Sequence, residues 1–210
     1  MIKPYYKTDL GVLYHGDCLE IMPMLEPVDL VLTDPPYGII PIRNFGVGSP
    51  YKKSDMEWDV KITQHHIDTI IKISKNQIIF GGNYYTDLLK PTRCWIIWNK
   101  LNGNNPFADF EMSWTNFKTS SRMFNCQWIG GSIRETICHP TQKPAALFIL
   151  ILEKYSNIDD IICDLFLGSG TTAIACERLN RRWIGIEIEE RYCEISAKRI
   201  EKERSQLKLF

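Results

Sequence analysis

Short runs of apolar and β-branched residues, each followed by a polar or glycine-containing turn, alternate with segments of helical spacing along most of this chain. Residues 28–33 (VDLVLT) show the first pattern most clearly, because so apolar a run is typical of a buried parallel strand. Strands of this kind joined by helices form a mostly parallel, twisted sheet with helices on both faces. A chain of 210 residues, 44% of them hydrophobic, can bury one such core. We therefore expect a single α/β domain over residues 1–210.

The same patterns predict where each element lies. Strands are expected over residues 12–17 (ending in a turn), 28–33, 77–80, 94–98, 110–114, 158–164 and 183–187. Helices are expected over residues 19–25, 65–74, 145–155, 173–179 and 191–206. The alternation in 110–114 indicates a half-buried or edge strand, and the charged 191–206 helix is expected to face solvent.

Two segments lack a clean period. Residues 39–58 contain several glycines and prolines and are expected to form a mobile loop over the site. Residues 115–138 contain Lys118, Arg122 and Arg134 with interleaved aromatic residues. Lys plus Arg and Asp plus Glu both total 25, so the chain as a whole does not attract nucleic acid. Binding to DNA would need a local basic patch, and residues 115–138 are the candidate.

Cysteine usage and hydropathy restrict the compartment. The seven cysteines form no CxxC pair, and the amino terminus does not resemble a signal peptide, so we expect reduced thiols, a cytoplasmic location and no metal site. The longest apolar run, residues 145–152 (AALFILIL), is far shorter than the ~20 residues that span a bilayer. No membrane association is expected.

Asp34-Pro35-Pro36-Tyr37 directly follows the 28–33 strand. The carboxyl ends of parallel strands are where open α/β sheets bind ligands. A carboxylate, a rigid proline backbone and an aromatic ring together suit a planar amino group. Asp34 and the Pro35 carbonyl can accept its two N–H groups while Tyr37 stacks on a flipped base. The motif therefore indicates methyl transfer onto a nucleobase amine, against the plainer interpretation of a turn that ends a strand.

A glycine loop provides the second candidate site. Gly168-Ser169-Gly170 with Ala173 follows a predicted strand, and Glu187 ends the next one, as in dinucleotide sites. Asp164 argues against a pyrophosphate, because its charge would repel one. It suits a cationic ligand such as S-adenosylmethionine, whose ammonium Asp164 would bind while Glu187 accepts from the ribose hydroxyls.

With these motifs, the chain resembles the DNA amino-methyltransferases of the beta class, in which the catalytic motif precedes the cofactor motif. The resemblance covers nearly the whole chain and implies a Rossmann-like methyltransferase fold that uses S-adenosylmethionine. It implies Asp34, Pro35, Pro36 and Tyr37 as catalytic residues. The implied cofactor-binding residues are Asp17, Cys18, Asp34, His139, Thr141, Lys143, Asp164, Phe166, Gly168, Ser169, Gly170, Thr171, Thr172 and Glu187.

The resemblance also implies a substrate and partners. Asp rather than Ser at position 34 favours the N6 amine of adenine, with the N4 amine of cytosine as the alternative. Two other hypotheses are a non-catalytic DNA-binding relative and a nicotinamide-dependent oxidoreductase. Asp164 disfavours the oxidoreductase. Double-stranded DNA with a flipped base is the implied substrate, and a homodimer and a restriction endonuclease are the implied partners. Two departures from the family are Asn99, where Asp is common, and the shortness of residues 115–138 as a target-recognition region.

Overall fold

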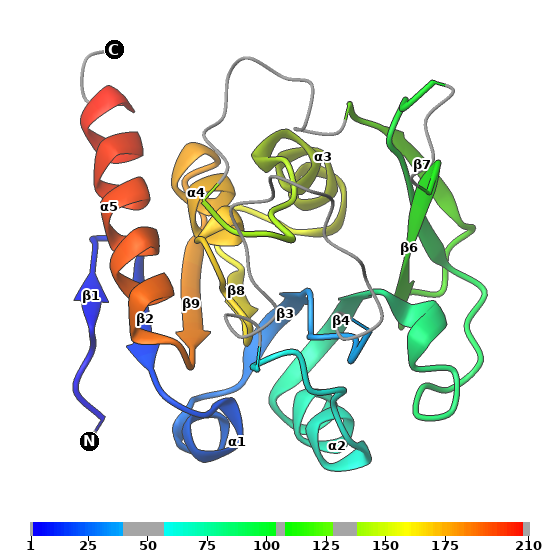
Figure 1. Cartoon of the computed structure of the whole chain (residues 1–210), viewed down its shortest axis with the longest axis horizontal. Helices are drawn as coiled ribbons and strands as arrows, with labels where there is room; N and C mark the ends of the chain where they lie inside the picture. The colour runs from blue at the N-terminus through cyan, green and yellow to red at the C-terminus, as the bar shows by residue number, and fades with distance from the viewer. Residues whose placement is uncertain (1, 40–56, 104–107, 128–137, 208–210) are drawn as a thin grey trace.

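The computed structural model describes residues 2–39, 57–103, 108–127 and 138–207, and in this part of the chain the strands form one sheet (Figure 1). The strands are β1 (Tyr6–Lys7), β2 (Gly11–His15), β3 (Val28–Thr33), β4 (Ser74–Phe80), β5 (Trp95–Asn99), β6 (Phe110–Thr115), β7 (Arg122–Asn125), β8 (Ile161–Asp164) and β9 (Arg182–Glu187). Their order across the sheet is β1-β2-β9-β8-β3-β4-β6-β5-β7. The predicted strand at 28–33 is confirmed residue for residue, and the predicted α/β class is confirmed.

Parallel pairing brings the candidate motifs together. β2, β9, β8, β3 and β4 are successive neighbours that run in the same direction. Their carboxyl ends therefore lie along one edge of the sheet, here called the site edge. Each strand of this set is followed by a segment that carries a predicted site residue or contacts one.

Helices cover both faces of the sheet. The helices are α1 (Cys18–Ile21), η1 (Met22–Met24), α2 (Gln64–Ile73), η4 (Gly82–Tyr84), α3 (Ala145–Tyr155), α4 (Thr171–Arg178) and α5 (Glu190–Leu207). Leu30 and Leu32 of β3 pack with α3 and α4 on one face, and Val31 packs with α1 and α2 on the other. Each fully buried aliphatic side chain of this kind stabilises the fold by about 1.5–3 kcal/mol. The apolar strand is therefore buried on both sides, as its sequence predicts.

Two predicted elements differ in part from the structure. β6 fits the half-buried alternative and not the edge one, because it lies between β4 and β5 and is antiparallel to both. Its first residues lie beyond Phe80, where β4 ends, and are partly exposed, while Ser113, Trp114 and Thr115 are buried. α5 does not simply face solvent, since Cys193, Ser196 and Ile200 on one side of it are fully buried.

Several residues of the two aperiodic segments lie outside the described ones. The expected loop over 39–58 falls largely in this category, as do residues 128–137 of the expected insertion. The described part of the insertion contains β7, a strand that the sequence did not predict and that pairs in parallel with β5. None of the helices in the described ranges combines the length and apolarity needed to cross a membrane.

Candidate active site

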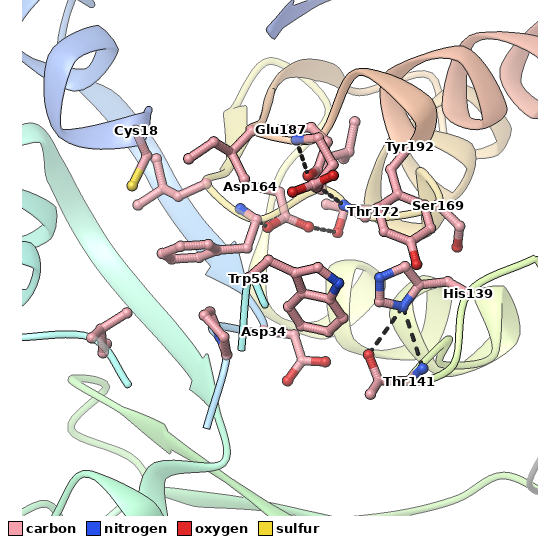
Figure 2. A pocket seen from close by; sticks show the side chains of 18 of the residues that line it. Cys18, Asp34, Trp58, His139, Thr141, Asp164, Ser169, Thr172, Glu187 and Tyr192 are labelled. Carbon is pink, nitrogen blue, oxygen red and sulfur yellow. Dashed lines mark hydrogen bonds between the residues drawn. The ribbon is translucent and has the colours of Figure 1, made fainter. Parts of the chain in front are cut away.

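A cavity of about 490 Å³ opens along the site edge, a size within the usual range for small-molecule pockets. The residues after β2, β3, β8 and β9 line it, together with residues 57–66 and 139–143. Figure 2 shows Glu187, Asp164 and Thr172 on one side of this space and Asp34 across from them, with the Trp58 indole between. The predicted catalytic and cofactor motifs thus share one cavity.

The Glu187 carboxylate organises the end of the cavity nearest β9. Its two oxygens accept hydrogen bonds from the Gly168 N–H (2.7 Å) and the Glu189 N–H (2.9 Å). Burial raises the pKa of Glu187 to about 7, although both backbone donors act in the opposite direction. The backbone carbonyl of Glu187 accepts from the Gly16 N–H, so the turn after β2 is fixed beside it.

Asp164, at the end of β8, is 4% exposed and surrounded by neutral donors. Its oxygens accept from the hydroxyls of Thr33 (2.8 Å) and Thr172 and from the Phe166 N–H (3.2 Å). Burial raises its pKa to about 6 against these hydrogen bonds. Neither Asp164 nor Glu187 has a lysine or arginine at ion-pair distance among the described residues. Two buried carboxylates without a neighbouring cation favour a ligand that brings its own positive charge and has hydroxyl groups to donate. S-adenosylmethionine, with its ammonium group and its ribose, is such a ligand.

The glycine loop between β8 and α4 depends on left-handed backbone at Gly168 (φ +54°) and Gly170 (φ +86°). A side chain at Gly170 would also approach Ser196 of α5 to 3.1 Å. Gly170 therefore sets the start of α4. It is also the one predicted cofactor-binding residue that does not line the cavity.

The segment after residue 138 forms another wall. The Nδ1 atom of His139 accepts from the Thr141 N–H (3.3 Å), and its ring packs against Tyr192 (4.3 Å) and Trp58 (5.2 Å). Burial, followed by the nearby Lys143 cation, lowers the pKa of His139 to about 3. His139 is thus neutral near pH 7 and contributes shape and a hydrogen bond to the wall.

The predicted catalytic motif is held in place by several hydrogen bonds. The Tyr85 hydroxyl donates to the carbonyls of both Pro35 and Pro36 at 3.0 Å. The Tyr37 hydroxyl donates to one oxygen of Asp34 (2.5 Å), and the Lys143 ammonium donates to the other. Burial raises the pKa of Asp34, with Lys143 acting against that rise.

The Tyr37 ring has little free space. It stacks on Tyr84, with ring centroids 4.7 Å apart, and a side chain at Gly81 would meet it at 2.2 Å. Gly81, with φ +65°, is therefore required for the ring to lie where it does. Tyr37 and Pro35 do not line the cavity, whereas Asp34 and Pro36 do. Stacking of a base on the covered Tyr37 face would require Tyr84 to move.

Several residues of the site were not found from the sequence. Trp58 lies in the cavity, and its Nε1 is buried without a hydrogen-bond partner among the described residues. Asp59 accepts from the Gly38 N–H (3.0 Å) and so attaches this wall to the catalytic turn. His66 lines the cavity, and Glu111 of β6 contacts Lys143. A Trp-Asp pair is too common in sequences to signal such roles.

The described part of the expected DNA-facing segment lies elsewhere. β6 is antiparallel to β4, so it leads residues 116–121 to the edge opposite the site edge, where the Asn116 side chain bonds the start of β4. Lys118 follows there, and Arg122 begins β7 beside Ile96 in the second position of β5. These two basic residues therefore do not extend the site edge. Arg134 lies outside the described residues.

Comparison with known proteins places these features in a family. The DNA methylase family model N6_N4_Mtase matches residues 51–198. The type II methyltransferase M2.MboI of Moraxella bovis is 27% identical, with 94% of this chain and 91% of the relative covered. M2.DpnII of Streptococcus pneumoniae is 26% identical, with 97% and 94% covered.

Solved structures support the fold. The M1.HpyAVI–SAM complex has a TM-score of 0.62 at 24% identity over 90% of this chain and 98% of that one. The cytosine-N4-specific PvuII DNA methyltransferase has a TM-score of 0.69 at 19% identity, over 97% and 93%. Taken with the family model, which matches more than half of the residues, these findings show that the chain belongs to the N6/N4 DNA methylase family.

Proposed function

We propose that this DNA methylase transfers a methyl group from S-adenosylmethionine to the exocyclic N6 amine of adenine in double-stranded DNA. The observation that carries the proposal is that Asp34 lines the same cavity as Asp164 and Glu187. An acceptor for an amine thus faces two carboxylates suited to a cationic nucleoside. S-adenosylmethionine, when bound there, would supply the methyl group of its sulfonium: the methyl–sulfur bond would break as the N–C bond forms, the sulfur would leave as a neutral thioether, and the nitrogen would release one proton.

The chain's own residues position the amine. The lone pair of a nucleobase amine is delocalised into the ring, so the nitrogen is a weak nucleophile. It becomes a better one when hydrogen bonds to its N–H groups favour the pyramidal form of the nitrogen. Asp34 accepts one N–H and stabilises the positive charge that develops on nitrogen during transfer. The sequence predicts the Pro35 carbonyl as the acceptor of the other N–H, but Pro35 does not line the cavity, so the base would have to shift the catalytic turn to use the lone pair that the Tyr85 hydroxyl leaves free. Alignment therefore contributes most of the catalysis.

The wider cavity holds the cofactor. Asp164 accepts from the ammonium group, and Glu187 accepts from the ribose hydroxyls. Gly168, Ser169, Thr171 and Thr172 form the loop around the methionine part, and Asp17, Cys18 and Phe166 form the adenine end. His139 and Thr141 close the opposite wall. Pro36 and Tyr37 keep the catalytic turn rigid, and Gly170 acts indirectly by starting α4.

The proposal extends to the protein's setting. A cytoplasmic enzyme with a restriction endonuclease partner fits the two curated relatives, both named type II methyltransferases. A homodimer is proposed because a chain of 210 residues contacts little DNA alone. The presence of Asp rather than Ser at position 34 favours adenine as the target.

The test is transfer of an isotope-labelled methyl group from S-adenosylmethionine to unmethylated genomic DNA, followed by mass spectrometry of the nucleosides. Labelled N6-methyladenine is expected. Labelled N4-methylcytosine would keep the chemistry and overturn the choice of base. Bound cofactor without transfer to DNA would overturn the proposal.

A further inference from the structure

Four charged side chains of alternating sign form a chain of contacts from Asp34, after the central strand β3, to Lys100, after β5. Lys100, just after β5, lies 2.7 Å from one oxygen of Glu111 on β6. The other oxygen of Glu111 lies 3.4 Å from the Lys143 ammonium, which also donates to Asp34. The order is Lys100, Glu111, Lys143, Asp34.

Lys143 occupies a place that conflicts with the proposed chemistry. Together with the Tyr37 hydroxyl it engages both oxygens of Asp34, the group that must accept the target amine. Its positive charge would also oppose the charge that develops on the amine nitrogen. For methyl transfer, the ammonium must therefore weaken its contact with Asp34.

The surroundings limit where the ammonium can go. Lys143 is 6% exposed, and its Nζ lies 5.0 Å from the Phe80 ring centroid and 5.7 Å from that of Tyr37. Burial alone would lower the pKa of Lys143, but Asp34 and Glu111 outweigh burial and raise it. A buried lysine that stays charged requires another anion within reach.

Glu111 is that anion. Its Oε2 is buried and has no hydrogen-bond partner among the described residues, although Lys143 lies 3.4 Å away. Lys100 contacts the opposite oxygen and so competes with Lys143 for the charge of Glu111. We propose that Glu111 is a positioning residue that accepts the Lys143 ammonium when the target amine binds Asp34. This inference rests on the proposed function.

The test compares two single-charge changes in the same network, Glu111→Gln and Lys100→Gln. The first removes the acceptor for Lys143 and leaves the ammonium on Asp34. The second removes a competitor for Glu111 and strengthens its attraction for Lys143. If the network were only structural, both changes would impair the enzyme alike.

Steady-state kinetics with S-adenosylmethionine and DNA give the readout. For Glu111→Gln we expect kcat to fall roughly tenfold, the scale of a lost charged hydrogen bond, with KM for the cofactor unchanged. For Lys100→Gln we expect no fall in kcat. A Glu111→Gln kcat within twofold of the unmodified protein, or equal losses in both variants, would overturn the inference.

Thermal unfolding of each variant checks the fold. If Glu111→Gln does not fold, Glu111→Asp, which keeps the charge at a greater distance, replaces it, and an unchanged kcat would then overturn the inference. The two proposals fail separately, because unmodified protein that makes no N6-methyladenine refutes the function. Unmodified protein that makes it while Glu111→Gln is unimpaired refutes only the role of Glu111.

Discussion

The two ends of the site treat their carboxylates in opposite ways. At the cofactor end, Asp164 and Glu187 are bonded to hydroxyls and backbone N–H groups, and their pKa values are raised to about 6 and about 7. At the catalytic end, Asp34 and Glu111 are paired with the lysines Lys143 and Lys100. The carboxylates of the cofactor end thus have no positive partner, whereas those at the end with Asp34 are already neutralised by lysines.

This difference matches the two ligands. A cationic cofactor can supply the missing charge at the first end, which strengthens its binding. A nucleobase amine is neutral, so the second end must balance its own charges before and after the base enters. The arrangement of countercharges therefore distinguishes the two ligands before either binds.

The largest effect is expected from Asp34→Ala. Removal of the amine acceptor should lower methyl transfer by about 100-fold to 1,000-fold or more, the scale seen when one group that stabilises transition-state charge is removed. Binding of S-adenosylmethionine, measured by calorimetry, should remain largely intact because the cofactor-end carboxylates are unchanged. Near-normal methyl transfer would refute the mechanism.

A smaller effect is expected from Asp164→Asn. Loss of the charged contact to the ammonium should weaken cofactor binding by roughly 1.5–3 kcal/mol. Glu187→Gln is the matched control, and it should cost less because its proposed partner, the ribose, is neutral. Titration calorimetry on both variants checks this, and a greater loss for Glu187→Gln would reverse the assignment of the two carboxylates.

The pH dependence should show the same difference. The folded pKa values of Asp164 and Glu187 lie above the unfolded values of about 4, so the folded protein binds more protons. Their contribution to the stability of the cofactor-free protein is present below pH 4 and is lost as the pH rises through about 6 and about 7. Binding of a cation to the ionised groups offsets that loss.

The increase in Tm caused by S-adenosylmethionine should therefore grow between about pH 5 and pH 8. Thermal unfolding with and without the cofactor measures it at each pH. In Asp164→Asn the growth should be smaller. An increase in Tm that does not depend on pH would contradict the proposal that these carboxylates bind the cationic cofactor in their ionised form.

The smallest effect is expected from Arg122→Ala. The sequence pattern predicts weaker DNA binding, but Arg122 begins β7 away from the site edge. We therefore expect the affinity for DNA and its salt slope to change little. A slope reduced by about 0.9 would indicate a lost phosphate contact and restore Arg122 to the DNA-binding surface.

The sequence predicted the parts of the molecule that local patterns determine. The apolar run of β3 and the motifs after β3 and β8 identify their own places at the sheet edge. β7 was missed because Arg122–Asn125 is mostly exposed and becomes a strand by pairing with β5. Trp58 and Glu111 reach the site only through the tertiary fold, so no spacing in the chain connects them with Asp34 or Lys143.

The position of β2 beside β9 has a consequence for synthesis of the protein. The Gly16 N–H bonds the Glu187 carbonyl, and Asp17 and Glu187 line the same cavity although they are far apart in the chain. A growing polypeptide therefore presents its catalytic turn long before the partner strand of β2 leaves the ribosome. Contacts of such long sequence separation slow folding, because closing the intervening loop costs entropy first. A polypeptide that has not yet reached β9 lacks Glu187 and the bond that fixes the turn after β2, so its cofactor end is incomplete.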